Sequence, residues 1–136
     1  MRTLSTRLKA VLGVLVLTTT AFVAVSITHP GKADAAGCLD GSNQQDVSLP
    51  SGSLRYPSSG YFKTTSNCQD INLSGNPWYS QNVRAIKVCF RTAGCQDHWT
   101  NVKGSSWYEI ATNVKDGTEY YFKFYSYGKW HGLVAD

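Results

Sequence analysis

Apolar and polar residues alternate along several short segments of the chain. In residues 83–91, the side chains of Ile86, Val88 and Phe90 fall on one face, while the other face is mixed and includes charged residues. A repeat of two residues is typical of a β-strand with one buried face. Residues 107–114 show the same repeat, so both segments are predicted to be strands whose apolar faces point to a core.

A turn signal follows the second of these segments. Asp116 and Gly117 favour a tight hairpin turn, because glycine adopts the positive φ that such turns require. Residues 118–127 are therefore predicted to return as the partner strand of residues 107–114. Short stretches of β-branched and aromatic residues add weaker strand candidates at 60–65, 71–73, 95–102 and 130–134. About six short antiparallel strands predict an all-β fold, either a small antiparallel β-sandwich or an open barrel.

The first 35 residues have the composition of a secretory signal peptide. Three basic residues precede an apolar stretch at 10–27, and the small residues Ala33 and Ala35 mark a cleavage site. Cleavage is predicted after Ala35, with cleavage after Ala36 as the alternative. The protein is therefore expected to be secreted and extracellular, and no later segment is long and apolar enough to hold the mature chain in a membrane.

Residues 36–59 differ from the rest of the mature chain. They are rich in Ser, Gly, Asn, Gln and Asp, and Val47, Leu49 and Leu54 are isolated apolar residues among them. Such a composition is typical of a segment without a core of its own. We interpret residues 36–59 as a polar extended arm and residues 60–136 as the β-domain.

The charge balance argues against one class of partner. The full chain has 13 Lys and Arg and 9 Asp and Glu, which gives a formal net charge of +4. Four of the basic residues and one of the acidic residues lie in residues 1–35, so the mature chain has a net charge of +1. Nucleic-acid-binding domains are generally far more basic, so no nucleic acid is expected among the partners.

Four cysteines follow the signal peptide, and an even number in a small exported domain predicts two disulfides. The sequence allows three pairings. Cys89 and Cys95 are the preferred pair, because the five residues between them include Gly94 and can close a hairpin end. Cys38 and Cys68 then form the second pair. Oxidised cysteines do not act as nucleophiles or metal ligands, so these residues are assigned a structural role.

One predicted strand has a row of tyrosines. The even-numbered side of residues 119–127 supplies core residues, while the odd-numbered side includes Tyr121, Lys123, Tyr125 and Tyr127. Tyrosine offers a large and stiff contact surface, so this row is a candidate binding face. The alternative is that both sides of the strand are buried and the rings only stabilise the sheet. Two further residues would extend the face, namely Trp107 and Trp130.

Catalytic patterns are sparse in the mature chain. Its histidines are His98 and His131, and Asp97 and His98 point to opposite faces if they lie in a strand. No serine has the Gly-x-Ser-x-Gly context of an exposed nucleophile. Glu109 and Glu119 flank the predicted turn, a pattern more typical of solvent-facing charges than of a glycosidase pair. We therefore predict that the protein is not an enzyme and has no catalytic residue, no cofactor and no metal site.

Three binding functions remain as hypotheses. In the first, a protein-binding subunit or adaptor, residues 39–59 dock on one partner as an added strand while the tyrosine row engages another. The pocket anchors on this arm would be Val47, Leu49 and Leu54. In another, a protease inhibitor, the loop closed by Cys89 and Cys95 and beginning at Arg91 enters a protease that prefers basic residues.

The remaining hypothesis is a carbohydrate-binding module. Tyr121, Tyr125, Trp107 or Trp130 would stack on sugar rings in that case. The hydroxyls of the sugar would then be hydrogen-bonded by Lys123, Glu109 or Asn113. A protein partner is preferred to a carbohydrate.

The whole layout resembles the small exported proteins of filamentous actinobacteria. It combines an export signal, a polar arm, two expected disulfides and an aromatic β-domain in residues 60–136. That group includes protease and amylase inhibitors, crystallin-like killer proteins and the small adaptor subunits of umbrella-type toxin particles. The resemblance to the adaptors implies a role in joining a lectin-like subunit to a large toxin polypeptide. The Trp-Arg-Tyr triplet of small amylase inhibitors is absent from the sequence, which argues against that group.

Overall fold

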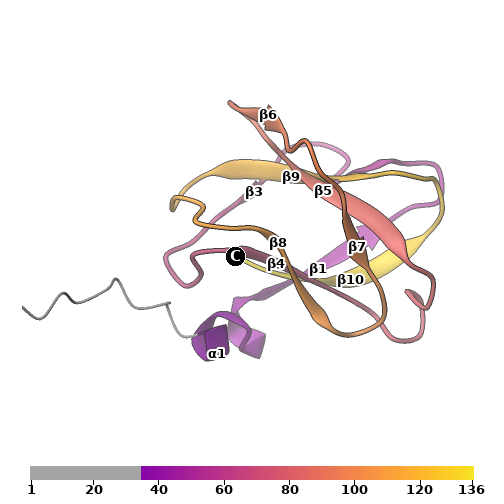
Figure 1. The fold of residues 1–136 in the computed structure, drawn as a ribbon, viewed down its shortest axis with the longest axis horizontal. Coiled ribbons are helices and arrows are strands. Elements are labelled where there is room, and N and C mark those ends of the chain that lie inside the picture. Colours follow the sequence, from indigo (N-terminus) through magenta and orange to yellow (C-terminus); the bar gives the residue numbers. More distant parts are fainter. Residues whose placement is uncertain (1–34) are drawn as a thin grey trace, which may run out of the picture.

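The computed structural model describes residues 35–136, which form two antiparallel β-sheets packed face to face (Figure 1). Sheet A has the strand order β1-β10-β4-β8, with β1 at Gln44–Leu49, β10 at Trp130–Ala135, β4 at Ile71–Gly75 and β8 at Trp107–Ala111. Sheet B has the order β2-β9-β5-β6, with β2 at Arg55–Tyr56, β9 at Glu119–Phe124, β5 at Arg84–Phe90 and β6 at Gly94–Cys95. Two short strands complete it, β3 at Phe62–Lys63 beside β9 and β7 at Thr100–Val102 beside β5. The prediction of an all-β fold with antiparallel sheets is confirmed.

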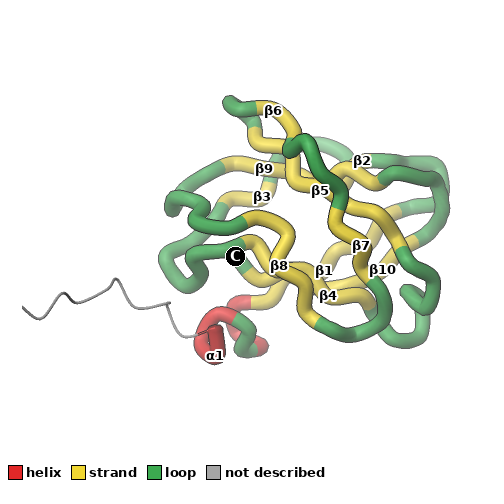
Figure 2. The backbone as a smooth tube through the Cα atoms, viewed as in Figure 1, coloured by secondary structure: helices red, strands yellow, loops and turns green. Residues whose placement is uncertain are grey.

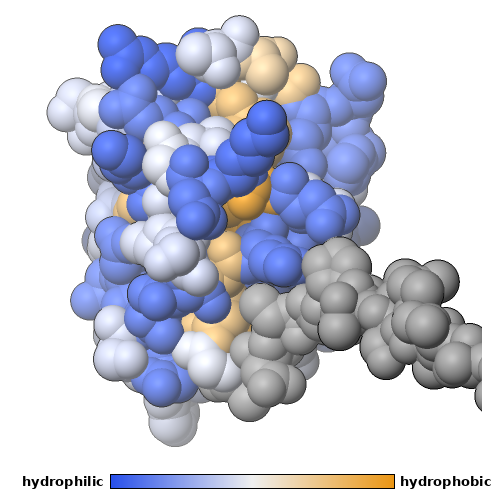
Figure 3. Space-filling model, turned by 90° about the vertical axis from the view of Figure 1, so that its left-hand side faces the viewer, coloured by the Kyte–Doolittle hydropathy of each residue, from blue (hydrophilic) through white to orange (hydrophobic). Residues whose placement is uncertain are grey.

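The loops gather at the two ends of the sandwich, as Figure 2 shows. Seen from one of these ends, apolar surface forms a narrow band between hydrophilic residues (Figure 3). No helix among residues 35–136 is long and apolar enough to cross a membrane. The predicted signal peptide, residues 1–35, lies almost wholly outside the described residues.

The core lies between the two sheets and follows the alternation of the sequence. Ile86 and Val88 on β5 are fully buried, as predicted, and so are Tyr120 and Phe122 on β9. Sheet A contributes a matching layer of apolar side chains from its own inner face. Its buried members include Val47, Leu49, Ile71, Leu73, Ile110, Trp130 and Val134.

The prediction that residues 36–59 form a free arm is wrong for the central part of this segment. Residues 44–49 form β1, which pairs with β10 along its whole length. Val47 and Leu49 are 0% and 2% exposed, so they are core residues and not anchors for a partner. Leu54 is half-buried, and its backbone oxygen accepts a hydrogen bond from the Phe124 amide at 2.8 Å. The physical reason is that an edge strand needs only one apolar face, so two apolar residues at a spacing of two are sufficient.

The predicted hairpin between residues 107–114 and 118–127 is also wrong. β8 pairs with β4 in sheet A, whereas β9 pairs with β5 in sheet B. Gly117 does have the positive φ of a tight turn, 75°, but this turn takes the chain from one sheet to the other. Thr64 holds the turn, because its hydroxyl donates to the Lys115 carbonyl at 2.7 Å and its carbonyl accepts from the Gly117 amide at 2.9 Å.

Both predicted disulfides are present. Cys89–Cys95 closes the β5–β6 hairpin, where the two residues are paired in register. Cys38–Cys68 joins α1, at Ala35–Cys38, to the loop before β4. Cys38 and Cys68 are both buried and pack with Ala135 in a small second cluster. This disulfide therefore fixes the segment before β1 against the end of the sandwich.

Candidate functional site

The outer surface of sheet B has an unusual set of side chains. We call it the cationic tyrosine face, because most of its members are basic or aromatic. The face consists of Arg55, Tyr61, Lys63, Lys87, Arg91, Trp99, Glu119, Tyr121, Lys123 and Tyr125. Of the predicted binding residues, the structure thus brings Tyr121, Lys123 and Tyr125 together on one face.

Three cations stand side by side across this face. Lys123 on β9 lies directly opposite Arg55 on β2 and directly opposite Lys87 on β5. Like charges at facing positions of neighbouring strands destabilise a sheet. Among the described residues 35–136, the only ion pair is Arg91 with Glu119, so none of these three cations has an acidic partner there. The row is therefore a concentration of positive charge that the domain itself leaves uncompensated.

Aromatic rings hold two of the three cations in place. The Arg55 guanidinium lies 4.2 Å from the centre of the Tyr121 ring and 5.4 Å from that of Tyr61. The Lys87 ammonium lies 4.6 Å from the centre of the Trp99 ring. Such contacts stabilise a cation without neutralising it.

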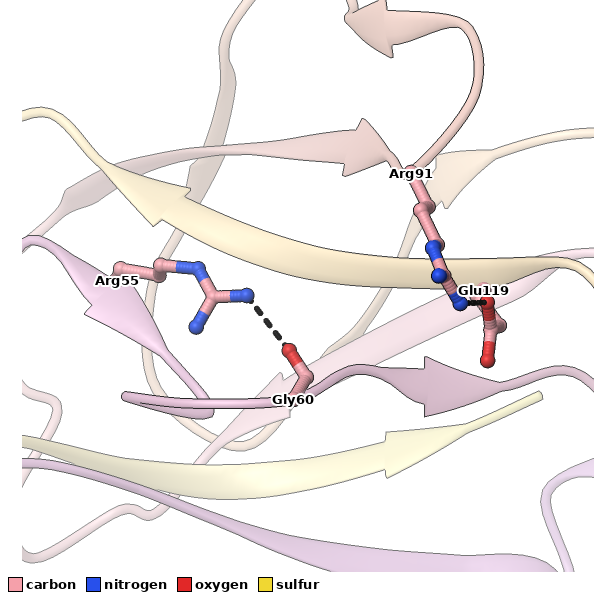
Figure 4. Close-up of polar contacts among 4 residues, drawn as sticks. All are labelled: Arg55, Gly60, Arg91 and Glu119. Carbon is pink, nitrogen blue, oxygen red and sulfur yellow. Dashed lines mark hydrogen bonds and ion pairs between the residues drawn. The ribbon is translucent and has the colours of Figure 1, made fainter.

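Arg55 is further fixed by backbone oxygens. Its guanidinium donates to the carbonyls of Pro57 and Gly60, each at 2.6 Å, and Figure 4 shows the second of these bonds. Both acceptors are uncharged, so the positive charge remains available to a ligand. A side chain that is already ordered loses less conformational entropy on binding.

At the end of the face, one acidic residue is present and is already paired. The Arg91 guanidinium contacts the Glu119 carboxylate at 2.5 Å (Figure 4). The hydrogen bond and the charge of Glu119 raise the pKa of Arg91 above its usual value. Tyr61 lies between the two arginines, since its ring centre is also 5.5 Å from the Arg91 guanidinium. Arg91 is therefore engaged within the domain, unlike the row formed by Arg55, Lys123 and Lys87.

The tyrosines of the predicted row differ in exposure. Tyr121 is half-buried against Arg55, while Tyr125 is 70% exposed and meets the edge of Trp99 with ring centres 5.4 Å apart. Tyr127 is 67% exposed but lies beyond the end of β9, in the turn before β10. Arg84 holds this turn by donating to the Ser126 and Tyr127 carbonyls, each at 2.9 Å.

The two tryptophans predicted to extend the face do not belong to it. Trp130 is 2% exposed and packs against Phe124 in the core, so its assignment as a binding residue is wrong. Trp130 lies an even number of residues from Val134 in β10, so both side chains point to the core, which the sequence alone did not reveal. Trp107 is half-buried in sheet A, not in sheet B, because β8 is not the partner of β9.

The distribution of charge is strongly uneven. Five of the nine basic residues in residues 36–136 are on the cationic tyrosine face, but only one of the eight acidic residues is. The small net charge of the mature chain therefore conceals a basic surface. Sequence reasoning missed five members of the face, because they join it only where β2, β3, β5 and β7 pair with their neighbours. They are Arg55, Tyr61, Lys63, Lys87 and Trp99.

The structure also separates residues considered for catalysis. Glu109 lies in sheet A and Glu119 in sheet B, so the two carboxylates do not face each other across a hairpin. Within residues 35–136, no group of three or more His, Cys, Asp or Glu side chains is placed to hold a metal ion.

Comparison with known proteins gives no relative. No protein-family model matches the chain. The curated proteins and the solved structures give no match either. The function is therefore inferred from the chain's own residues and geometry.

Proposed function

We propose that this chain is an exported, non-catalytic subunit or adaptor of an extracellular complex, and that its cationic tyrosine face binds an acidic surface of a partner protein. The observation that carries the proposal is the row formed by Arg55, Lys123 and Lys87, which has no acidic partner among the described residues. The repulsion within this row is relieved when opposite charges are brought against it.

The shape and composition of the face favour a protein as the partner. Arginine and tyrosine are enriched among the residues that dominate protein interfaces. The two hollows lined by Asp46 and Trp107 and by Tyr79 and Trp130 are built from residues outside this face. The ring contacts of Arg55 and Lys87 keep their charges in fixed positions, which favours recognition of a defined acidic surface.

Export is part of the same proposal. The two disulfides require an oxidising environment to persist, and the predicted signal peptide supplies the route to it. The resemblance to adaptor subunits of toxin particles fits a small binding domain of this kind. Of the two expected docking elements, the proposal keeps the tyrosine row and gives up the free arm at residues 39–59, because residues 44–49 of that arm are already paired in sheet A.

A protease inhibitor is a weaker candidate. An inhibitory loop must present its basic side chain freely to the protease pocket. The Arg91 guanidinium is instead bonded to Glu119, which would have to be displaced. Inhibition of a trypsin-like protease by the purified protein would contradict this preference.

A charge-reversal experiment tests the proposed function. The tagged mature protein is recovered from the culture fluid of its source at low salt, and companions present in stoichiometric amounts are identified by mass spectrometry. The variant is Lys87→Glu with Lys123→Glu, and the matched control is Lys103→Glu, an exposed lysine after β7.

The double variant is expected to lose its companion, with affinity at least about tenfold weaker, while the control keeps it. High salt is expected to release the companion from the wild type, because screening weakens exposed charge pairs. Recovery of the wild type without any companion, or equal recovery by the double variant, would refute the proposal.

A further inference from the structure

The outer surface of sheet A contains a hollow of about 280 Å³ that the proposed function does not use. Asp46 on β1, Leu133 on β10, Ser74 on β4 and Trp107 on β8 stand at one level across four neighbouring strands. Asp46 and Trp107 occupy the two sides, and the shorter Leu133 and Ser74 lie between them. Four strands span about 14 Å from first to last backbone, which leaves room for one small ring between the flanking side chains.

The polar groups around this hollow are available to a ligand. Within the part of the chain that the structure describes, no hydrogen bond is made by the carboxylate of Asp46, the indole N–H of Trp107 or the imidazole of His131. Asn76 uses its side-chain oxygen to accept from the Trp78 amide at 2.8 Å, which leaves its NH₂ group free to donate. The hollow thus combines one aromatic wall with hydrogen-bonding groups of both kinds.

The charge of this surface selects among ligand classes. The outward positions of the four strands include Asp46 and Glu109 but no lysine or arginine. The first hollow would therefore repel an anionic ligand such as a phosphate or a uronic acid, and the one basic residue nearby, Lys129, lines only the second hollow described below. A neutral sugar suits the site better, because its C–H face packs on an indole and its hydroxyls bond carboxylate, amide and imidazole groups.

A second hollow of about 320 Å³ adjoins the first. His131 lines both hollows. Tyr79 lines the second, is 73% exposed, and has its ring centre 6.0 Å from that of His131. Two hollows that share His131, each with an aromatic side chain, offer places for two successive units of a sugar chain. We propose that the outer surface of sheet A binds a neutral oligosaccharide, with one unit on Trp107 between Asp46 and Asn76 and the next beside Tyr79.

This inference is independent of the proposed function, because the two sites lie on different sheets. The test uses the uniformly ¹⁵N-labelled mature protein and titrates it with maltotriose, cellotriose, chitotriose, mannotriose and galactotriose, each to about 10 mM, which detects even millimolar affinity. The readout is the indole N–H signal of Trp107 in two-dimensional NMR spectra. At least one of these sugars is expected to shift that signal and leave the Trp99 indole signal unchanged.

Two variants keep the test decisive. Trp107 also packs on the Cys38–Cys68 cluster, so its replacement by alanine risks a change of fold. Asp46→Ala alters only an exposed side chain and is expected to weaken binding about tenfold, since a bond to a charged group is lost. Asp97→Ala, at an exposed position outside the site, is expected to bind like the wild type. No shift with any of the five sugars, or undiminished binding by Asp46→Ala, overturns the inference.

Discussion

The hydroxyl of Tyr120 stabilises a carboxylate in the protein interior, and its removal has a calculable cost. Tyr120 on β9 is 0% exposed and donates a hydrogen bond to Oδ2 of Asp136, which is 2% exposed. The other oxygen of this side chain, Oδ1, is buried and has no hydrogen-bond partner among residues 35–136. In Tyr120→Phe, neither carboxylate oxygen has a protein donor in that part of the chain.

The expected loss follows from the charge of the acceptor. A hydrogen bond to a charged group contributes about 1.5–3 kcal/mol, so Tyr120→Phe is expected to lower the free energy of unfolding by about 2 kcal/mol near pH 7. For a domain of this size, that corresponds to a fall in Tm of about 8–16 °C. The control is Tyr127→Phe, which removes an exposed hydroxyl and is expected to change stability by less than about 0.5 kcal/mol.

The pH dependence identifies the source of the loss. Burial raises the pKa of Asp136 above its usual value, and the hydrogen bond from Tyr120 opposes that rise. Burial also raises the pKa of Tyr120 well above its usual value, so the hydroxyl stays protonated and can donate near neutrality. The pKa of Asp136 is higher in the folded state than in the unfolded state. The contribution of Asp136 to stability is therefore fully present below the unfolded pKa and is lost as the pH rises through the folded pKa.

Removing the Tyr120 hydroxyl raises the folded pKa of Asp136 further, so the cost of Tyr120→Phe should grow from about pH 3 to about pH 7. Urea denaturation followed by circular dichroism at both values measures this difference. When Tyr120→Phe is made in a protein that already has Asp136→Asn, its cost is expected to be nearly the same at both pH values. An equal loss at both pH values would refute the reasoning.

Two further predictions concern β1 and the Cys38–Cys68 disulfide. Leu49→Ala is expected to lower the free energy of unfolding, measured by urea denaturation, by about 2–5 kcal/mol, because the apolar side of β1 is part of the core. The control Ser48→Ala should be nearly neutral. Equal and small effects of the two replacements would support the free arm instead. Replacing Cys38 and Cys68 together by serine is expected to cost about 3.5 kcal/mol, as loop-closure entropy predicts for a separation of 30 residues. A thermal melt unchanged by that double replacement would show that the disulfide does not constrain the unfolded chain.

Local patterns in the sequence predicted the elements whose signals are local. The alternation in residues 83–91 and 119–124 identified β5, β9 and their buried faces, because each strand has a full apolar side. The short gap between Cys89 and Cys95 identified the β5–β6 hairpin. The alternation along β9 also placed Tyr121, Lys123 and Tyr125 on one face.

The failures concern strand pairing, which is not local. Asp116 and Gly117 do form a turn, but turn chemistry does not decide whether the next strand joins the same sheet or the opposite one. The same limit hid the row of cations, since Arg55 and Lys87 are distant in sequence and meet only on either side of Lys123.

Zero-length cross-linking of the native complex tests the central claim most directly. A carbodiimide joins lysine amines to carboxylates in contact with them, so it reports which lysines meet acidic residues of the companion. We predict cross-links from Lys87 and Lys123 on the cationic tyrosine face. Cross-links from Lys103 and Lys129 in their place would contradict the account, because these lysines lie outside that face.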